Sequence, residues 1–352
     1  RQGDVRTALI ARRAAGSPPA GAGTKSTIPY ASRTWRRARR RPTMNAPAIL
    51  SLEHPHADPP AIGASMPVAR GIRWLRMPLP FALDHVNLWL CEGAGMAIVD
   101  CGFGDDATRA AWQAHFDGIL AGRGVDAVVA THYHPDHVGN AAWLTARFGV
   151  PVTMTYAEFL HANAVWRDDA PMSVEGYATF FAAHGLAAED AAALRARGNA
   201  YRRAVPAMPA TLRRIVDGDE LALGGTRFRV IAGYGHSPEH AALHAPAAGV
   251  LIAGDMLLPR ISTNVGVTPA EPDGDPLARF LDSLARFEAL PPDTLVLPSH
   301  GLPFRGIALR VAQLRAHHRA RLGELEAFVR DAARPVSAAD ALPVLFRRTL
   351  DL

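Results

Sequence analysis

The sequence predicts a layered α/β fold that carries a helical insertion and a short helical C-terminal tail. Its 352 residues are 49% hydrophobic and 20% charged, which is typical of a globular chain long enough to bury a large core. Short apolar segments alternate with amphipathic ones, as in proteins whose helices cover sheets. Five of the apolar segments are each followed by a histidine or an aspartate, at the strand ends where such folds place their sites.

The first part of the folded chain is predicted to alternate strands and helices. A tight turn at residues 93–95 joins two strands into a hairpin, because glycines flank a single alanine there. In that register Cys91 and Cys101 lie roughly 13 Å apart, too far for a disulfide. The predicted strands are 72–77, 86–91, 96–101 and 127–130, and the predicted helices are 108–120 and 140–148.

The second part is predicted to begin with the helical insertion. Residues 156–214 are rich in alanine, arginine and glutamate and have almost no β-branched runs, which favours helices. This insertion belongs to a main domain at 44–305, which is followed by a helical tail at 306–352. Beyond the insertion we expect strands at 226–232, 249–253 and 294–297, and helices at 276–289, 306–333 and 337–350.

The positive net charge of +5 comes from the first 43 residues. They hold eleven basic side chains and one acid, whereas residues 44–352 carry 27 basic and 32 acidic side chains. We interpret 1–43 as a disordered or non-native extension before Met44, with a basic targeting arm as the alternative. The net charge of the remaining chain gives no general case for nucleic-acid binding. No apolar run typical of an export signal or a membrane span follows, so we expect a cytoplasmic protein that does not enter membranes.

Histidines and aspartates are concentrated just after the predicted strands. His132, His134, Asp136 and His137 offer four potential metal ligands within six residues, directly after the strand at 127–130. In an extended loop, residues two apart point the same way, so His132 and His134 can bind one ion. Imidazole and carboxylate ligands suit zinc, iron or manganese, and the lack of cysteine ligands argues against a structural zinc site. The other strands lead to Asp100, His236, Asp255 and His300.

Residues 131–139, Thr-His-Tyr-His-Pro-Asp-His-Val-Gly, resemble the HxHxDH signature of the metallo-β-lactamase-fold hydrolases. The later motifs follow in order: Gly235-His236-Ser237-Pro238 resembles the second histidine motif, Gly254-Asp255 the bridging aspartate, and Ser299-His300-Gly301 the last histidine. Asp100 resembles the aspartate that closes the early hairpin. The resemblance covers about residues 70–305 and implies a four-layer αββα metallo-β-lactamase sandwich.

The resemblance also implies a binuclear site with two zinc ions per chain, for which iron or manganese can substitute. One ion would be held by His132, His134 and His236, and the second by Asp136, His137 and His300. Asp255 would bridge the two ions, and Asp136 and Asp255 would be the catalytic carboxylates. Two neighbouring cations can share a hydroxide that attacks a carbonyl or phosphoryl centre.

Four further residues are weaker candidates for supporting the ligands or contacting substrate. Asp100 is expected to hydrogen-bond a ligand histidine or the loop backbone, with a simple turn aspartate as the alternative. His240 either supports the site or begins a helix. Arg260 and Asn264 follow Asp255 closely and either contact substrate or lie in a surface loop.

The reaction expected from the resemblance is hydrolysis of a small ester, thioester or lactone, as by hydroxyacylglutathione hydrolase. The alternatives are a metal-dependent endoribonuclease and a persulfide dioxygenase with one iron. The C-terminal region also resembles a branch with a winged-helix-like tail, here short or truncated. The expected substrate is a small molecule, and it is anionic if the arginines of the insertion surround the site. Nucleic acid is retained as an alternative substrate. The sequence does not indicate the oligomeric state. The arginines of the insertion are Arg195, Arg197, Arg202, Arg203, Arg213 and Arg214.

Overall fold

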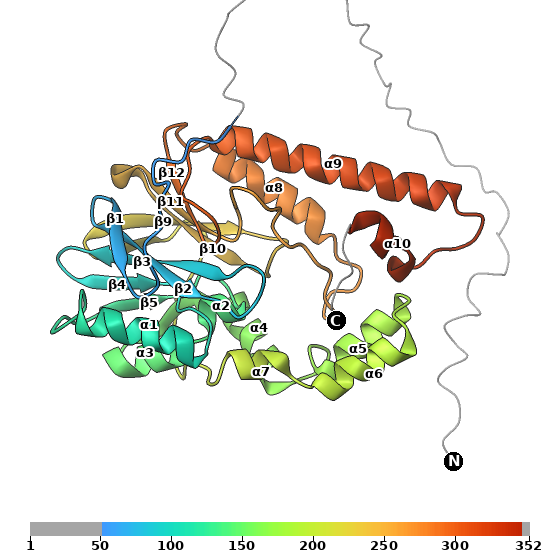
Figure 1. The fold of residues 1–352 in the computed structure, drawn as a ribbon, viewed down its shortest axis with the longest axis horizontal. Coiled ribbons are helices and arrows are strands. Elements are labelled where there is room, and N and C mark those ends of the chain that lie inside the picture. Colours follow the sequence, from blue (N-terminus) through green and yellow to red (C-terminus); the bar gives the residue numbers. More distant parts are fainter. Residues whose placement is uncertain (1–50, 347–352) are drawn as a thin grey trace, which may run out of the picture. The chain divides into compact units, whose positions relative to one another are not determined.

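The computed structural model describes residues 51–346. The basic segment at 1–43 and the last residues of the predicted tail, 347–352, lie outside this part of the chain. Within it, two sheets pack face to face and helices cover their outer faces (Figure 1). The predicted four-layer αββα sandwich is therefore confirmed.

The first sheet has seven strands in sequence order. Its first four strands are antiparallel, and β4, β5, β6 and β7 then run parallel. The predicted hairpin is confirmed, because Trp89 pairs with Val99 and Glu92 with Met96 across β3 and β4. The strands are β1 Ser65–Ala69, β2 Ile72–Pro78, β3 His85–Glu92, β4 Met96–Val99, β5 Ala127–Val129, β6 Val152–Thr155 and β7 Leu212–Ile215.

The second sheet has five strands in the order β12-β11-β10-β9-β8. All of its pairs are antiparallel except β11 with β12, which run parallel. This parallel pair brings the carboxyl ends of both strands to the same edge of the sheet. The strands are β8 Glu220–Leu223, β9 Thr226–Gly233, β10 His240–Ala245, β11 Val250–Gly254 and β12 Leu295–Pro298.

Several helices begin at side-chain caps that the sequence supplies. Asp105 accepts the backbone N–H of Thr108 at the start of α1, and Asp275 accepts that of Ala278 at the start of α8.

None of the helices in residues 51–346 combines the length and apolar character that a membrane span needs. The main helices are α1 Asp106–Asp117, α2 Pro135–Val138, α3 Ala141–Phe148, α8 Pro276–Glu288, α9 Ile307–Asp331 and α10 Ala338–Leu345.

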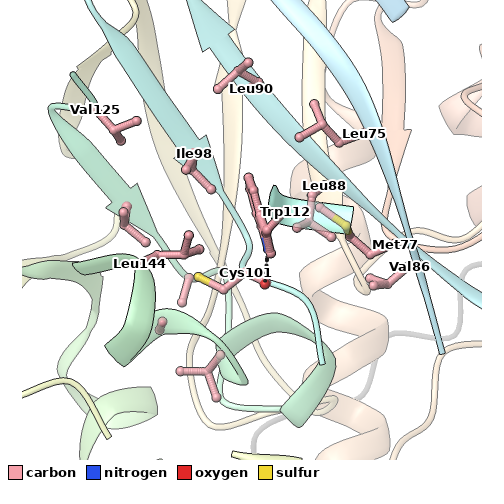
Figure 2. Packing of buried hydrophobic residues seen from close by; sticks show 14 of the residues in the cluster. Leu75, Met77, Val86, Leu88, Leu90, Ile98, Cys101, Trp112, Val125 and Leu144 are labelled. Atoms are coloured by element: carbon pink, nitrogen blue, oxygen red, sulfur yellow. Dashed lines mark hydrogen bonds between the residues drawn. The ribbon is translucent and has the colours of Figure 1, made fainter. Parts of the chain in front are cut away.

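Three apolar clusters separate the four layers. Trp74, Trp89 and Phe228 belong to the cluster between the two sheets, which holds residues of both. A second cluster lies between the first sheet and helices α1 and α3, where Trp112 donates its indole N–H to the carbonyl oxygen of Cys101 at 2.9 Å (Figure 2). The third lies between the second sheet and helices α8 and α9. Alternate side chains of each strand therefore enter different layers.

The segment expected to be a helical insertion differs from the prediction at its end. Four helices occupy most of it: α4 Tyr156–Arg167, α5 Val174–Ala183, α6 Ala188–Arg197 and α7 Ala200–Ala204. The last residues, however, form β7, which pairs in parallel with β6 at the edge of the first sheet. Two arginines in the middle of β7 are exposed, so the strand lacks the apolar pattern that would have revealed it.

Several other strands were not predicted. The strand β10 has the sequence His-Ala-Ala-Leu-His-Ala and is buried at every position. A strand buried on both faces shows no alternation of polar and apolar residues, and alanine favours helix over strand, so this segment carries no strand signal. Strands β1, β6 and β8, each of five residues or fewer, were also not predicted. The two cysteines are free and buried.

Candidate metal centre

The predicted metal ligands meet at one end of the sandwich, where strands of both sheets finish. The loop after β5 carries His132 and His134 and runs into α2, which carries Asp136 and His137. His236 follows β9, Asp255 follows β11 and His300 follows β12. The structure therefore brings all seven predicted ligands together, in two groups that can each hold a metal ion.

The first group is a triangle of three imidazole nitrogens. His134 Nδ1 lies 2.8 Å from His132 Nε2 and 3.0 Å from His236 Nε2, and the latter two nitrogens are 3.1 Å apart. Ligands about 2 Å from a tetrahedral zinc ion are separated by similar distances. Burial and the neighbouring imidazoles lower the pKa of His132 and His134, to about 3 for His134. These side chains are therefore neutral, which is the form that binds a metal.

The second group combines one carboxylate with two imidazoles. Asp136 Oδ2 lies 3.4 Å from His300 Nε2 and 3.6 Å from His137 Nε2. Burial acts to lower the pKa of His137, but the carboxylates of Asp100, Asp136 and Asp255 outweigh it and raise this pKa to about 10. A metal ion bound by the second group would replace the proton of His137. The same three carboxylates that stabilise this proton would then stabilise the metal ion.

Asp255 lies between the two groups. Its Oδ2 is 3.4 Å from His236 Nε2, in the first group. Its Oδ1 is 3.5 Å from His300 Nε2 and 3.7 Å from His137 Nε2, in the second. Asp255 Oδ1 and His137 Nε2 are buried and have no hydrogen-bond partner among residues 51–346. Buried polar atoms are rarely left unpaired, so these atoms fit ligands of a divalent cation.

Asp100 holds the outer side of the ligands, as expected. Its carboxylate accepts hydrogen bonds from the backbone N–H of Thr131 at 2.8 Å and from His137 Nδ1 at 2.9 Å. The Thr131 hydroxyl also lies 2.9 Å from this carboxylate and 3.1 Å from His132 Nδ1. Asp100 therefore fixes the ring of His137 with its Nε2 directed at the metal position.

His240 begins strand β10, so the expectation that it begins a helix is wrong. Its Nε2 accepts the backbone N–H of Asp255 at 3.2 Å, which fixes the residue that faces both groups. Gly254 makes this approach possible, because a Cβ atom there would lie only 2.2 Å from His240 Nε2. His240 thus acts on the backbone next to a ligand.

Arg260 and Asn264 lie in an exposed loop, which agrees with the surface-loop alternative and leaves the contact with substrate as a prediction. Both side chains are exposed, and that of Arg260 makes no hydrogen bond or ion pair within residues 51–346. Asn264 contributes through its backbone, because its carbonyl oxygen accepts the Nδ1–H of His236 at 2.7 Å. The carbonyl oxygen of His85 accepts the Nδ1–H of His300 in the same way, at 2.9 Å. Backbone partners of this kind leave no signal in the sequence.

Arg310 is a buried residue of α9 that was not among the predicted site residues. Its guanidinium donates to the carbonyl oxygens of Leu258 at 2.5 Å and Ile261 at 2.7 Å. These carbonyls belong to the loop that runs from Asp255 to Asn264. Helix α9 therefore holds in place the loop that orients His236.

Glu158, near the start of α4, is a second residue that sequence reasoning missed. Its buried carboxylate accepts three hydrogen bonds: from the backbone N–H of Tyr133 at 2.9 Å, and from the Ser237 hydroxyl and the backbone N–H of Glu239 at 2.6 Å each. It thus ties the loop that carries His132 and His134 to the loop that carries His236. An acid in the first turn of a helix is common, so its sequence context does not indicate this role.

We expect Glu158→Ala to lower the free energy of unfolding by about 2–4 kcal/mol, because it leaves three buried donors without an acceptor. Urea unfolding at neutral pH measures the change. Glu189→Ala, at an exposed acid in the first turn of α6, is the matched control and should alter stability by less than about 0.5 kcal/mol. Equal stabilities of the two variants would contradict the role of Glu158.

The fold and the donor set together define the class of protein. The model of the metallo-beta-lactamase superfamily matches residues 83–300. This match covers more than half of the chain and includes all seven predicted ligands, so the chain belongs to that superfamily. It is accordingly a metal-binding protein of the general hydrolase class.

Three individual proteins of known structure or curated name are similar to this chain. The chain is 48% identical to a beta-lactamase domain protein from Burkholderia ambifaria, whose crystal structure covers 84% of this chain and 88% of its own, with a TM-score of 0.74. A probable metallo-hydrolase of Bacillus subtilis (strain 168), YqjP, is 25% identical over 240 residues, which are 66% of this chain and 72% of that protein. A hydroxyacylglutathione hydrolase of Rhodobacter capsulatus is 40% identical over 86 residues, 24% of this chain and 31% of that enzyme.

Proposed function

We propose that this protein is a binuclear, zinc-dependent hydrolase of a small ester, thioester or lactone. The observation that carries the proposal is the position of Asp255, whose two oxygens face two separate ligand groups. A site for a single iron ion would need only one of these groups. The short match to a hydroxyacylglutathione hydrolase, which by its name acts on a thioester, supports the choice of substrate class.

His132, His134 and His236 would hold one ion, and Asp136, His137 and His300 the other, with Asp255 between them. Bound zinc supplies Lewis acidity and lowers the pKa of water toward about 7. Asp136 and Asp255 remain ionised, because the nearby histidines lower the pKa of each carboxyl even though burial acts to raise it. Three ligand rings are held in fixed orientations by hydrogen bonds at Nδ1. Asp100 accepts from His137, the carbonyl of His85 accepts from His300, and the carbonyl of Asn264 accepts from His236.

The first test is elemental analysis of the purified chain, beside an assay with esters, thioesters, lactones and a structured RNA. We expect about two zinc ions per chain and turnover of at least one ester, thioester or lactone. Chelation should remove both the metal and the activity, and zinc should restore them. One iron per chain with persulfide oxidation, or cleavage of RNA alone, would overturn the proposed function.

A further inference from the structure

A cavity of about 250 Å³ lies beside the first ligand group. His236 forms part of its wall, so the cavity borders a ligand residue of the first group. Tyr133 lines it as well, with its ring centroid 4.5 Å from that of the ligand His134 and 4.4 Å from that of His161 on α4. Its volume is smaller than the roughly 300–1,000 Å³ of pockets that hold drug-sized ligands, so it can take only part of most substrates.

The wall of this cavity combines aromatic and aliphatic side chains with the hydroxyl groups of Ser237 and Thr268 and an ion pair. Tyr133, His161 and Tyr234 provide three rings, and Pro238, Val267 and Pro276 add aliphatic surface. Burial lowers the pKa of His161 to about 4, so its ring adds no charge at neutral pH. These rings and aliphatic groups favour a compact apolar or aromatic group over a polar one.

The charged residues of the cavity neutralise each other. Arg279 and Glu271 line it and form a two-pronged ion pair, with Nη1 of Arg279 2.7 Å from Oε2 of Glu271. A substrate carboxylate or phosphate would have to compete with Glu271 for the guanidinium. The cavity therefore offers an anion no unpaired positive side chain among its lining residues.

The arginines of the helical segment do not line the cavity and so do not change its charge. Arg195 pairs with Glu175, and Arg202 donates to the carbonyl oxygen of Trp166 and lies over its ring. Arg214 lies over the ring of Tyr156. The sequence-based expectation of an anionic substrate therefore finds no support at this cavity.

We propose that this cavity binds the acyl group of the substrate and that it selects compact, uncharged, apolar or aromatic acyl groups. This inference rests on the proposed function as an ester or thioester hydrolase. Thiol leaving groups such as glutathione or coenzyme A are charged, and the larger of them exceed the cavity in size, so they fit poorly inside it. The acyl group is the part of the substrate that matches its volume and its neutral wall.

The test compares p-nitrophenyl esters with a constant leaving group and different acyl groups: acetate, butanoate, hexanoate, benzoate and the hydrogen succinate. For the zinc-loaded full chain, we expect kcat/KM for butanoate or benzoate to exceed that for acetate by about tenfold or more. The anionic succinate should be the poorest substrate of similar length. A preference for succinate would overturn the inference.

Two variants reshape the wall in opposite directions. Tyr234→Ala enlarges the cavity and should raise the ratio of kcat/KM for hexanoate over acetate by about tenfold. Val267→Trp fills it and should lower the ratio for benzoate over acetate by a similar factor. Tyr156→Ala, at an exposed tyrosine of α4 that does not line the cavity, is the matched control and should leave both ratios unchanged. Unchanged ratios in both cavity variants, with metal content intact, would overturn the inference.

Binding of benzamide, measured by calorimetry, separates this inference from the proposed function. Benzamide is uncharged, compact and aromatic, and it carries no ester bond. Saturable binding to the wild-type chain that weakens at least tenfold in Val267→Trp would support the acyl cavity even if no ester is turned over. Turnover and two zinc ions without such binding would support the hydrolase and overturn the acyl cavity.

Discussion

Asp255→Ala is expected to remove at least one of the two metal ions and to lower kcat/KM by about a thousandfold or more. Within residues 51–346, Asp255 is the residue that offers one oxygen to each ligand group. Its loss also removes one of the negative charges close to His137 and His300. The first group would then consist of imidazoles alone, and these neutral ligands bind a cation more weakly. Removal of one electrostatic contact to a developing charge typically costs about 10²–10³ in rate, and loss of a metal ion adds to that.

Elemental analysis and turnover of the same preparation measure this effect. Asp255→Asn provides a graded comparison, since it keeps one oxygen ligand and should retain more metal than the alanine variant. Asp169→Ala, at an exposed aspartate of the loop after α4, is the matched control and should keep two metal ions and full activity. Two metal ions per chain in Asp255→Ala would show that the assignment of Asp255 as a shared ligand is wrong.

Gly139→Ala is expected to destabilise the protein by at least about 3 kcal/mol and to lower its metal content. Gly139 follows α2, the short helix that carries Asp136 and His137. A Cβ atom at this position would lie 2.4 Å from the carbonyl oxygen of Pro135, 2.5 Å from the backbone nitrogen of Gly104 and 2.6 Å from the carbonyl oxygen of Gly102. All three are backbone atoms, so no side chain can rotate away, and overpacking of this kind is strongly destabilising.

Urea unfolding with and without chelator measures the change in stability. The matched control is Gly323→Ala in helix α9, where the added Cβ atom meets nothing within 4 Å. Because alanine is the better helix former, this control should gain about 0.5–1 kcal/mol. If the two variants had the same midpoint of unfolding, close backbone packing around α2 would not be the constraint that the structure indicates.

The layered fold was predictable because five strands in residues 51–346 are short apolar runs followed by a histidine or an aspartate, namely β4, β5, β9, β11 and β12. The hairpin at 86–101 was predictable from its glycine turn, and its register is the one observed. The alanine-rich β10 and the arginine-bearing β7 were not predictable, since their strand pairing depends on neighbours distant in the sequence. Tertiary context decides such segments because propensity alone is a weak constraint.

The sequence by itself determined which residues gather at the metal centre. Four potential ligands lie within six residues at His132 to His137, and three more follow predicted strands, so the layered fold leaves them one common edge. Local spacing and strand periodicity carry that information without knowledge of the packing.

Only the tertiary structure decided how these residues are held and what lies beside them. The two faces of Asp255, the backbone oxygens of His85 and Asn264, and the three hydrogen bonds of Glu158 join residues that are 19 to 215 positions apart. The acyl cavity is likewise formed by loops brought together from separate elements. Such contacts depend on how the two sheets and their covering helices pack, and the pattern of a single segment does not contain that information.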